Sequence, residues 1–429
     1  MFALQNLTLM SRIRSTFFAE ENVRAICKAA TARDGKGFSI ISAHCEPLKH
    51  GFAVMFRDMD EKGGCHAKQY PTDAMTRDAF QLAEMLALIQ ARLSEGEIAC
   101  IKDAFNRDSA REEDFSSIAL EIWIYLIFFN PSNSVRFNDK AVGWDVEVEH
   151  KGVIFTLQCK SIRYGLGRLR KSDARAFEGL LHHLRLRGVD PGANRRFLGF
   201  EIPQLDAFKD LGLIKKVAAY VADRCNGASA GGEVFSDVIK LVAEGSSSCE
   251  TVDAFGKRFS DMTREGAQRP QWSLPVHTFP SADRSVNAGA IQFALPLDVE
   301  NMIRRCAKQF GQALDGLRGR PNPVVVLGIE ASQIKLREGH LVDKAKMRST
   351  IQSVAAEIWG AVTNKSQWAD CYGCFLVFKM PSWTLDFLGQ GRATSLPLYL
   401  EWRNPESGNR RPMLPPLNTR FLLGGGYRA

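Results

Sequence analysis

Residues 142–161 read VGWDVEVEHKGVIFTLQCKS, and this stretch decides the fold that the sequence predicts. Apolar and polar side chains alternate along 142–149, which is typical of a β-strand with one buried face. A second strand-like run follows at 153–160, after the turn residues at 150–152. The stretch is therefore expected to form a β-hairpin.

The register of this hairpin follows from its turn. If the turn is centred on 151 and 152, Asp145 lies opposite Gln158, and Gly143 lies opposite Lys160. Residues two apart on a strand share a face, so Asp145, Gln158 and Lys160 are expected to point the same way. Directly opposed Cβ atoms lie about 5 Å apart. Cys159 points to the other face, into the core, which argues against a role as a nucleophile.

These residue types suit the hydrolysis of a phosphodiester. Mg²⁺ prefers oxygen ligands, and one or two carboxylates plus an amide oxygen are enough to hold it against a phosphate. The metal acidifies a bound water and neutralises the developing charge. Asp145 and Gln158 are therefore predicted as ligands of Mg²⁺ (or Mn²⁺), and Lys160 as the cation that stabilises the reacting phosphate.

A helix is predicted over 112–129, ended by Asn130 and Pro131. Glu121 is the only charged residue in its segment IALEIWIYLIFF, at 118–129. Burial of a lone carboxylate is unfavourable, and a metal ion or Lys160 would relieve it. The alternative is that Glu121 sits at the edge of the apolar face and reaches water.

GWDVEV, followed by a strand that ends in LQCKS, resembles the PD-(D/E)xK nuclease superfamily. The QxK form is most similar to its Mrr-like restriction endonuclease branch, and the glutamate helix fits the same pattern. The resemblance covers roughly 112–202. It implies a restriction-endonuclease-like αβββαβ core, with Asp145, Gln158, Lys160 and Glu121 as catalytic residues, and with Glu121, Asp145 and Gln158 as metal ligands. It also implies DNA cleavage in restriction or anti-phage defence.

Two departures from the family pattern bear on activity. Gln158 leaves the site one negative charge short of the acidic version, which favours a degenerate site. Glu147 and Glu149 continue the face of Asp145, and either could substitute as a ligand or simply be solvated; for Glu147 the structural or solvent-facing role is preferred.

Two boundaries of the core are open. In the preferred arrangement the core spans 111–225, and strands at 134–138, 142–149 and 153–160 are followed by a helix at 171–187 and a strand at 197–202. Short connections favour it. In the alternative, 161–290 is an insertion, and a helix at 299–317 and a strand at 323–329 complete the sheet. Lys308 and Gln309 would then line the groove.

The rest of the chain is expected to form an α/β (α+β) protein with additional terminal regions. Residues 1–110 are predicted as an N-terminal α/β region of unknown role, with strands at 37–43 and 51–56 and a helix at 72–93. A polar linker or insertion around a helix at 234–243 is predicted for 226–290. For 291–429 a C-terminal α/β region is predicted, with a further helix at 348–362 and strands at 372–379 and 396–402.

Positive charge is concentrated next to the hairpin. The formal net charge is +8, and ten basic residues stand between Gln158 and Arg196 against three acidic ones. Such a surplus suits a polyanion. The residues expected to contact the phosphate backbone are Arg163, Arg168, Arg170, Lys171 and Arg175. DNA is the preferred partner. The alternatives are an RNA-processing nuclease and a nucleic-acid-binding protein with an inactive nuclease fold.

Composition excludes other classes of protein. The longest apolar run, Ile122–Phe129, is far shorter than the roughly 20 residues that span a bilayer, so no membrane is expected. The ten cysteines are scattered, which favours free thiols in a cytoplasmic protein over a disulfide framework. Cys371 and Cys374 have no matching pair for zinc and are predicted as core residues. Cutting both strands of a duplex often uses two sites, which favours a homodimer, and an activating partner is the other assembly considered.

Overall fold

The computed structural model describes residues 2–31, 47–62, 74–106, 112–137, 145–162, 179–180, 182–184, 186–189, 196–201, 210–227, 238–246, 250–251, 271–277, 285–286, 288–294, 299–330, 344–379, 398–405 and 414–418. Its helices are α1 (Phe2–Phe17), α2 (Glu20–Ala30), α4 (Pro47–Lys62), α5 (Ala74–Gln90), α6 (Glu95–Asn106), α7 (Glu112–Phe128), α9 (Leu211–Cys225), α11 (Val299–Gly316), α12 (Lys344–Thr363) and the 3-10 helix η4 (Ser366–Asp370). Its strands are β1 (Asn133–Phe137), β2 (Val146–His150), β3 (Val153–Ile162), β4 (Arg196–Glu201), β5 (Lys240–Ser246), β6 (Glu250–Thr251), β7 (Gln271–His277), β8 (Ser285–Val286), β9 (Ala288–Ala294), β10 (Pro323–Glu330), β11 (Gly373–Lys379) and β12 (Leu398–Arg403).

The chain divides into two compact units. The first unit holds Met1–Arg163, Val299–Ser332 and Ile351–Ala429, and the second holds Tyr164–Asp298 and Gln333–Thr350. The second unit is thus inserted twice into the sequence of the first. The chain leaves the first unit just after β3 and again just after β10.

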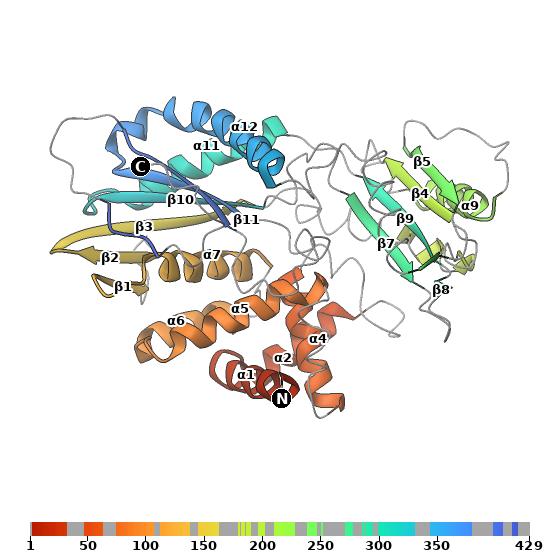
Figure 1. Ribbon diagram of the computed structural model, residues 1–429, viewed down its shortest axis with the longest axis horizontal. Helices are drawn as coiled ribbons and strands as arrows, with labels where there is room; N and C mark the ends of the chain where they lie inside the picture. The colour runs from red at the N-terminus through yellow and green to blue at the C-terminus, as the bar shows by residue number, and fades with distance from the viewer. Residues whose placement is uncertain are drawn as a thin grey trace. The chain divides into compact units, whose positions relative to one another are not determined.

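A six-stranded mixed sheet forms the centre of the first unit, in the order β1-β2-β3-β10-β11-β12 (Figure 1). The central strands β3, β10 and β11 run parallel to one another, and the outer pairs are antiparallel. β10 reads PVVVLGIE and is fully buried along Val324–Leu327. A strand with both faces covered by helices has this continuous apolar sequence. The expectation of a mixed α/β fold is confirmed.

The β2–β3 hairpin has the expected register. Val146 pairs with Leu157, and His150 pairs with Val153. The connection is the two-residue turn Lys151-Gly152, and both residues have positive φ angles, of 51° and 77°. Two successive positive φ angles define the turn that matches the twist of a hairpin, and glycine at the second position favours it.

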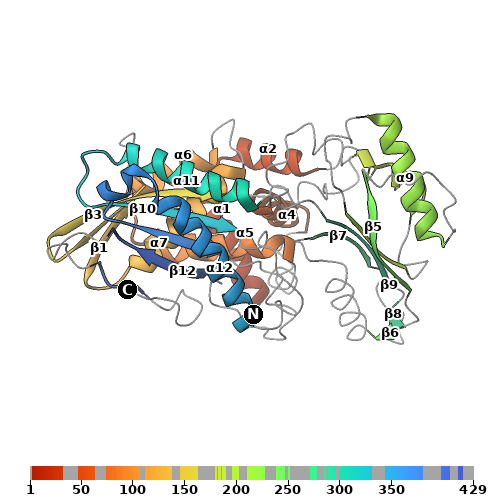
Figure 2. The same ribbon diagram turned by 90° about the horizontal axis from the view of Figure 1, so that it is seen from above.

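Helices cover both faces of this sheet. α7 lies on one face and contacts β1, β2 and β3, whereas α11 lies on the opposite face and contacts β3 and β10. α12 lies beside α11 on that face (Figures 1 and 2), where Trp359 donates from Nε1 to Oε2 of Glu401 on β12 over 2.8 Å. Strand β3 is therefore enclosed between α7 and α11.

The N-terminal helices share a core with the sheet rather than forming a separate region. α4, α5 and α6 pack on the outer side of α7 (Figure 1). An aromatic cluster joins α4 and α6 to α7: Phe18, Phe52, Phe56, Phe105 and Phe115. This explains why α7 is apolar on nearly all sides.

The strand predicted at 51–56 is wrong, because these residues belong to α4. A six-residue apolar run fits a strand or a buried helix equally. Phe52, Met55, Phe56 and Met59 follow helical spacing, and the first three are fully buried. The strand predicted at 37–43 lies outside the described residues. The helix predicted at 72–93 corresponds to α5.

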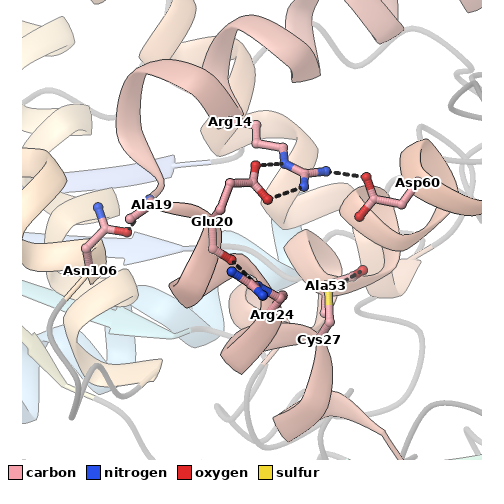
Figure 3. Close-up of polar contacts among 8 residues, drawn as sticks. All are labelled: Arg14, Ala19, Glu20, Arg24, Cys27, Ala53, Asp60 and Asn106. Atoms are coloured by element: carbon pink, nitrogen blue, oxygen red, sulfur yellow. Dashed lines mark hydrogen bonds and ion pairs between the residues drawn. The ribbon is translucent and has the colours of Figure 1, made fainter.

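An arginine links three of the N-terminal helices (Figure 3). Arg14 of α1 donates from Nε and Nη2 to the two carboxylate oxygens of Glu20, over 3.0 and 2.8 Å, and from Nη1 to Asp60 over 2.6 Å. Nearby, Asn106 Oδ1 accepts from the backbone N–H of Ala19 over 2.8 Å, just before α2 begins. These contacts fix α1, α2 and α4 and satisfy a free N–H at a helix start.

The second unit contains a four-stranded sheet in the order β5-β4-β9-β7. Strand 196–201 (β4) belongs to this sheet and not to the sheet of the first unit. The preferred prediction, a core that spans 111–225, is therefore wrong. The neighbour of β3 is instead β10, with Gln158 opposite Val325. The alternative arrangement, with helix 299–317 and strand 323–329 after an insertion, is the one that the sheet has. The apolar sequence of β10 makes it the better central strand.

The interval 226–290 is not a linker around one helix. Its residues 240–246 form strand β5, which overlaps the predicted helix at 234–243, and β7 and the start of β9 lie in the same interval. Within the helix predicted at 171–187, the structure describes 179–180, 182–184 and 186–187. These residues are helical except for the turn residue at 187. The helices and strands predicted for the C-terminal region are confirmed to within a few residues, as α11, α12, β10, β11 and β12.

Candidate functional site

Asp145 and Gln158 are joined across the β2–β3 hairpin. Gln158 donates from Nε2 to Oδ2 of Asp145 over 3.0 Å, and the backbone N–H of Cys159 donates to the same oxygen over 2.6 Å. The backbone N–H of Asp145 in turn donates to the carbonyl of Leu157 over 2.9 Å. Two hydrogen bonds therefore hold the Asp145 side chain against β3, and a third holds its backbone there.

The carboxyl group of Asp145 lies in an environment that disfavours its charge. Burial raises its pKa above the usual range. The hydrogen bond from Cys159, the positive charge of Lys160 and the hydrogen bond from Gln158 all act in the opposite direction without cancelling the effect of burial. A buried carboxylate in this state gains from any further cation that reaches it.

Lys160 shares the face of Gln158 on β3. It is half-buried, pairs with Leu327 on β10, and acts electrostatically on Asp145. Within the described part of the chain, Lys160 forms no ion pair with a carboxylate. Asp145, Gln158 and Lys160 are therefore brought together as the hairpin register predicts.

Cys159 and Glu121 lie toward the other face of β3. The thiol of Cys159 is fully buried, and burial raises its pKa well above the usual range; the carboxylates of Asp145 and Glu121 raise it further, and Lys160 opposes them. A buried thiol of this kind is unreactive, as expected. Asp145 and Glu121 both act on one sulfur atom, so the half-buried Glu121 of α7 lies close to β3.

A glycine sets the approach of α7 to the sheet. A Cβ at Gly328 of β10 would lie 2.6 Å from Cδ2 and 2.8 Å from Cδ1 of Leu120, the residue before Glu121. Gly328 pairs with Ser161, the residue after Lys160. Sequence reasoning missed this contact, although a lone glycine in a buried strand signals a close approach.

The donor set fits a hard divalent cation. Both hydrogen bonds to Asp145 end on Oδ2, and Gln158 donates through its nitrogen, so Asp145 Oδ1 and Gln158 Oε1 remain as oxygen donors. Among the described residues, no group of three or more histidine, cysteine, aspartate or glutamate side chains could hold a metal. An ion at this site therefore has to draw on the amide of Gln158 and on water or phosphate oxygens.

Comparison with protein-family models, curated proteins and solved structures gives no match. The site is thus interpreted from its own residues. Among the helices that the structure describes, none is long and apolar enough to cross a membrane.

Glu147 has a structural partner. Its carboxylate accepts from Nε of Arg136 over 2.6 Å, and the two residues are paired on β2 and β1. Glu149 is exposed. The structural role preferred for Glu147 agrees with this ion pair.

The structure describes only some of the other predicted residues. Arg163, Arg168, Arg170, Lys171 and Arg175 lie outside the described residues. On α11, Lys308 is exposed, whereas Gln309 is half-buried. Cys371 and Cys374 are fully buried free thiols in the core, as expected.

Proposed function

We propose that this chain is a magnesium-dependent nuclease that hydrolyses phosphodiester bonds, with DNA as its substrate. The observation that carries the proposal is the Asp145–Gln158 hydrogen bond on one face of a β-hairpin, with Lys160 acting on the same carboxylate. A carboxylate, an amide and a lysine in this arrangement supply two oxygen ligands and one cation for a phosphate.

The order of elements supports a restriction-endonuclease-like core. α7 is followed by three antiparallel strands, and α11 is followed by β10, which lies parallel to β3. This is an αβββαβ order, interrupted by the second unit. The resemblance of GWDVEV and LQCKS implies the same order of elements. The proposed role in restriction or defence rests on that resemblance.

Each residue has a distinct task in the proposed reaction. Mg²⁺, when bound, would acidify a water molecule and stabilise the charge on the phosphate. Asp145 and Gln158 would hold it through Oδ1 and Oε1, and the bond between the two side chains fixes their relative orientation. Lys160 would stabilise the negative charge of the transition state. The prediction that Glu121 is a third ligand is not kept, because this α7 residue lies on the Cys159 side of β3, opposite to Gln158 and Lys160.

The test is plasmid cleavage by the purified full-length chain in Mg²⁺ and in EDTA, beside Asp145→Ala and Lys160→Ala. Glu147→Gln is the matched control, because it removes a carboxylate from the same strand that is already engaged by Arg136. We expect Mg²⁺-dependent cutting that both site variants abolish and the control retains. Cutting that survives in Asp145→Ala would refute the site.

A second candidate is a nucleic-acid-binding protein that has lost catalysis. Gln158 favours it, because a site with fewer carboxylates binds Mg²⁺ more weakly. Salt-sensitive DNA binding with no cleavage of DNA or RNA, in Mg²⁺ or Mn²⁺, would support this candidate. Cleavage of RNA but not of DNA would instead change the substrate and leave the site intact.

A further inference from the structure

Basic side chains gather at the end of a helical segment in the second unit. His182 and His183 lie with their ring centroids 5.8 Å apart, and Arg187 follows one turn later. The segment ends at Gly188, whose φ is +62°, and the N–H of Val189 donates to the carbonyl of Leu184 over 3.1 Å. A left-handed glycine with this hydrogen bond is a common helix end, so the backbone that carries these side chains is regular up to Gly188.

A second helix brings another cation to the same place. A Cβ at Gly179 would lie in ordinary contact, at 3.7 Å, with Cδ1 of Ile214 on α9, so the segment packs against the first turns of α9. Lys215 is the next residue. The pKa of His183 is lowered, by slight burial first and then by the positive charges of His182, Lys215 and Arg187. Basic side chains of two elements therefore lie close enough to His183 to act on its charge.

No carboxylate of the described residues forms an ion pair with these four side chains. Asp210, the acidic residue nearest to Lys215 on α9, is engaged as the helix N-cap, where its side chain accepts from the N–H of Gly212 over 2.8 Å. Repulsion among basic side chains that no described carboxylate neutralises is unfavourable, and a bound anion would offset it.

Helix dipoles do not account for the arrangement. His183 and Arg187 stand at a helix C-terminus, where cations are stabilised, but Lys215 stands near the N-terminus of α9, where they are not. Exposed apolar side chains flank the cations as well. Leu186 and Leu211 are 68% and 57% exposed, and they account for two of the three large exposed hydrophobic side chains in the described residues.

We propose that the surface formed by His182, His183, Arg187 and Lys215 is a nucleic-acid contact of the second unit, separate from the Asp145 site. The choice of nucleic acid as the anion rests on the proposed function. A duplex offers phosphates to the cations and sugar edges to Leu186 and Leu211. The sequence favours this role, because ten basic residues, Arg187 among them, stand between Gln158 and Arg196 against three acidic ones.

The test is binding of the full-length chain to a fluorescent 20-base-pair DNA duplex, followed by anisotropy in EDTA at several salt concentrations. We expect Arg187→Glu/Lys215→Glu to weaken binding by at least about tenfold and to reduce the slope of log K against log salt by about 2, one for each lost phosphate contact. Arg187→Gln/Lys215→Gln should show the same loss of slope. Lys102→Glu/Lys240→Glu is the control, since both lysines are exposed and lie outside this surface.

The outcomes separate this inference from the nuclease proposal. Equal affinity of the Arg187/Lys215 variants and the wild type, or an equal loss in the control, overturns the inference. Absence of DNA binding by the wild type also overturns it. The selective loss without plasmid cleavage supports the contact surface and counts against the nuclease. Plasmid cleavage together with unaffected DNA binding in the Arg187/Lys215 variants supports the nuclease and overturns the contact surface.

Discussion

Gln158 donates a hydrogen bond of 3.0 Å from Nε2 to Oδ2 of Asp145, and so the two proposed ligands are linked before any metal arrives. This link orients the amide with its oxygen free. It also allows Gln158 to stabilise the Asp145 carboxylate without adding charge, which a glutamate could not do. Compared with a glutamate, the glutamine therefore raises the stability of the metal-free protein and lowers the affinity for a metal.

Replacement of Gln158 by glutamate should raise metal affinity and lower the stability of the metal-free protein. We expect Gln158→Glu to bind Mg²⁺ roughly tenfold more tightly, because ligand charge sets divalent affinity. The metal-free protein should unfold at a lower temperature, because two carboxylates would lie side by side. Calorimetric titration and thermal unfolding with and without Mg²⁺ measure both effects. Gln158→Leu is the control, and a similar gain in affinity in that variant would contradict the explanation.

Asp145 should make stability depend on pH. Its pKa is raised in the folded state, so the folded protein binds the proton more tightly than the unfolded chain. The free energy of unfolding then falls as pH rises from the unfolded pKa of about 4 through the folded pKa. In EDTA, Asp145→Asn should be more stable than the wild type at pH 8, and the difference should shrink toward pH 4. Urea unfolding across this range measures it, with exposed Glu149→Gln as the control. A difference that grows toward acid pH would show the sign to be wrong.

Gly328 should not tolerate a side chain. The added Cβ of Gly328→Ala would meet the buried Leu120 at 2.6 Å, so we expect a loss of about 1–3 kcal/mol in the free energy of unfolding. Gly360→Ala is the matched control, since nothing lies within 4 Å of its Cβ, and it should gain up to about 1 kcal/mol.

A double variant tests the cause of that loss. Leu120→Ala/Gly328→Ala should be less destabilised than the sum of the two single variants, because the first change makes room for the second. Strict additivity would mean that the Leu120 contact is not responsible.

Glu97 should be important for the attachment of α6 to the sheet. One carboxylate oxygen accepts from the backbone N–H of Phe137 on β1 over 2.8 Å, and the other accepts from the N–H and hydroxyl of Ser94, both over 2.8 Å. Glu97→Ala leaves two N–H groups without their acceptor, so we expect a loss of about 2–4 kcal/mol. Chemical denaturation measures it. Exposed Glu95→Ala should lose under about 1 kcal/mol, and equal losses would rule out the bridging role.

The hairpin could be predicted from the sequence because its information is local. Lys151-Gly152 fixes the turn, the turn fixes the register, and the register places Asp145 beside Gln158. The same is true of α7 and β10, which have long apolar runs. The mixed α/β class and the placement of Asp145 beside Gln158 therefore follow from short segments.

The partner of β3 could not be predicted in this way. β4 and β10 are both plausible neighbours, and the preference for a short connection selects β4, which is incorrect here. The segment 51–56 failed for a related reason, because its burial among α-helices comes from Phe18, Phe105 and Phe115, far away in the sequence. Pairing of distant segments depends on packing that no local pattern records.

The interruption between β3 and β10 has a consequence for synthesis of the protein. Translation delivers β3 well before residues 323–330, so the edge of β3 that will pair with β10 waits while the whole interval 164–298 emerges from the ribosome. An unpaired strand edge is a template for association with other chains. The nascent protein is thus most vulnerable to aggregation in this interval, and chaperones that shield strand edges should matter more to its yield than to its final stability.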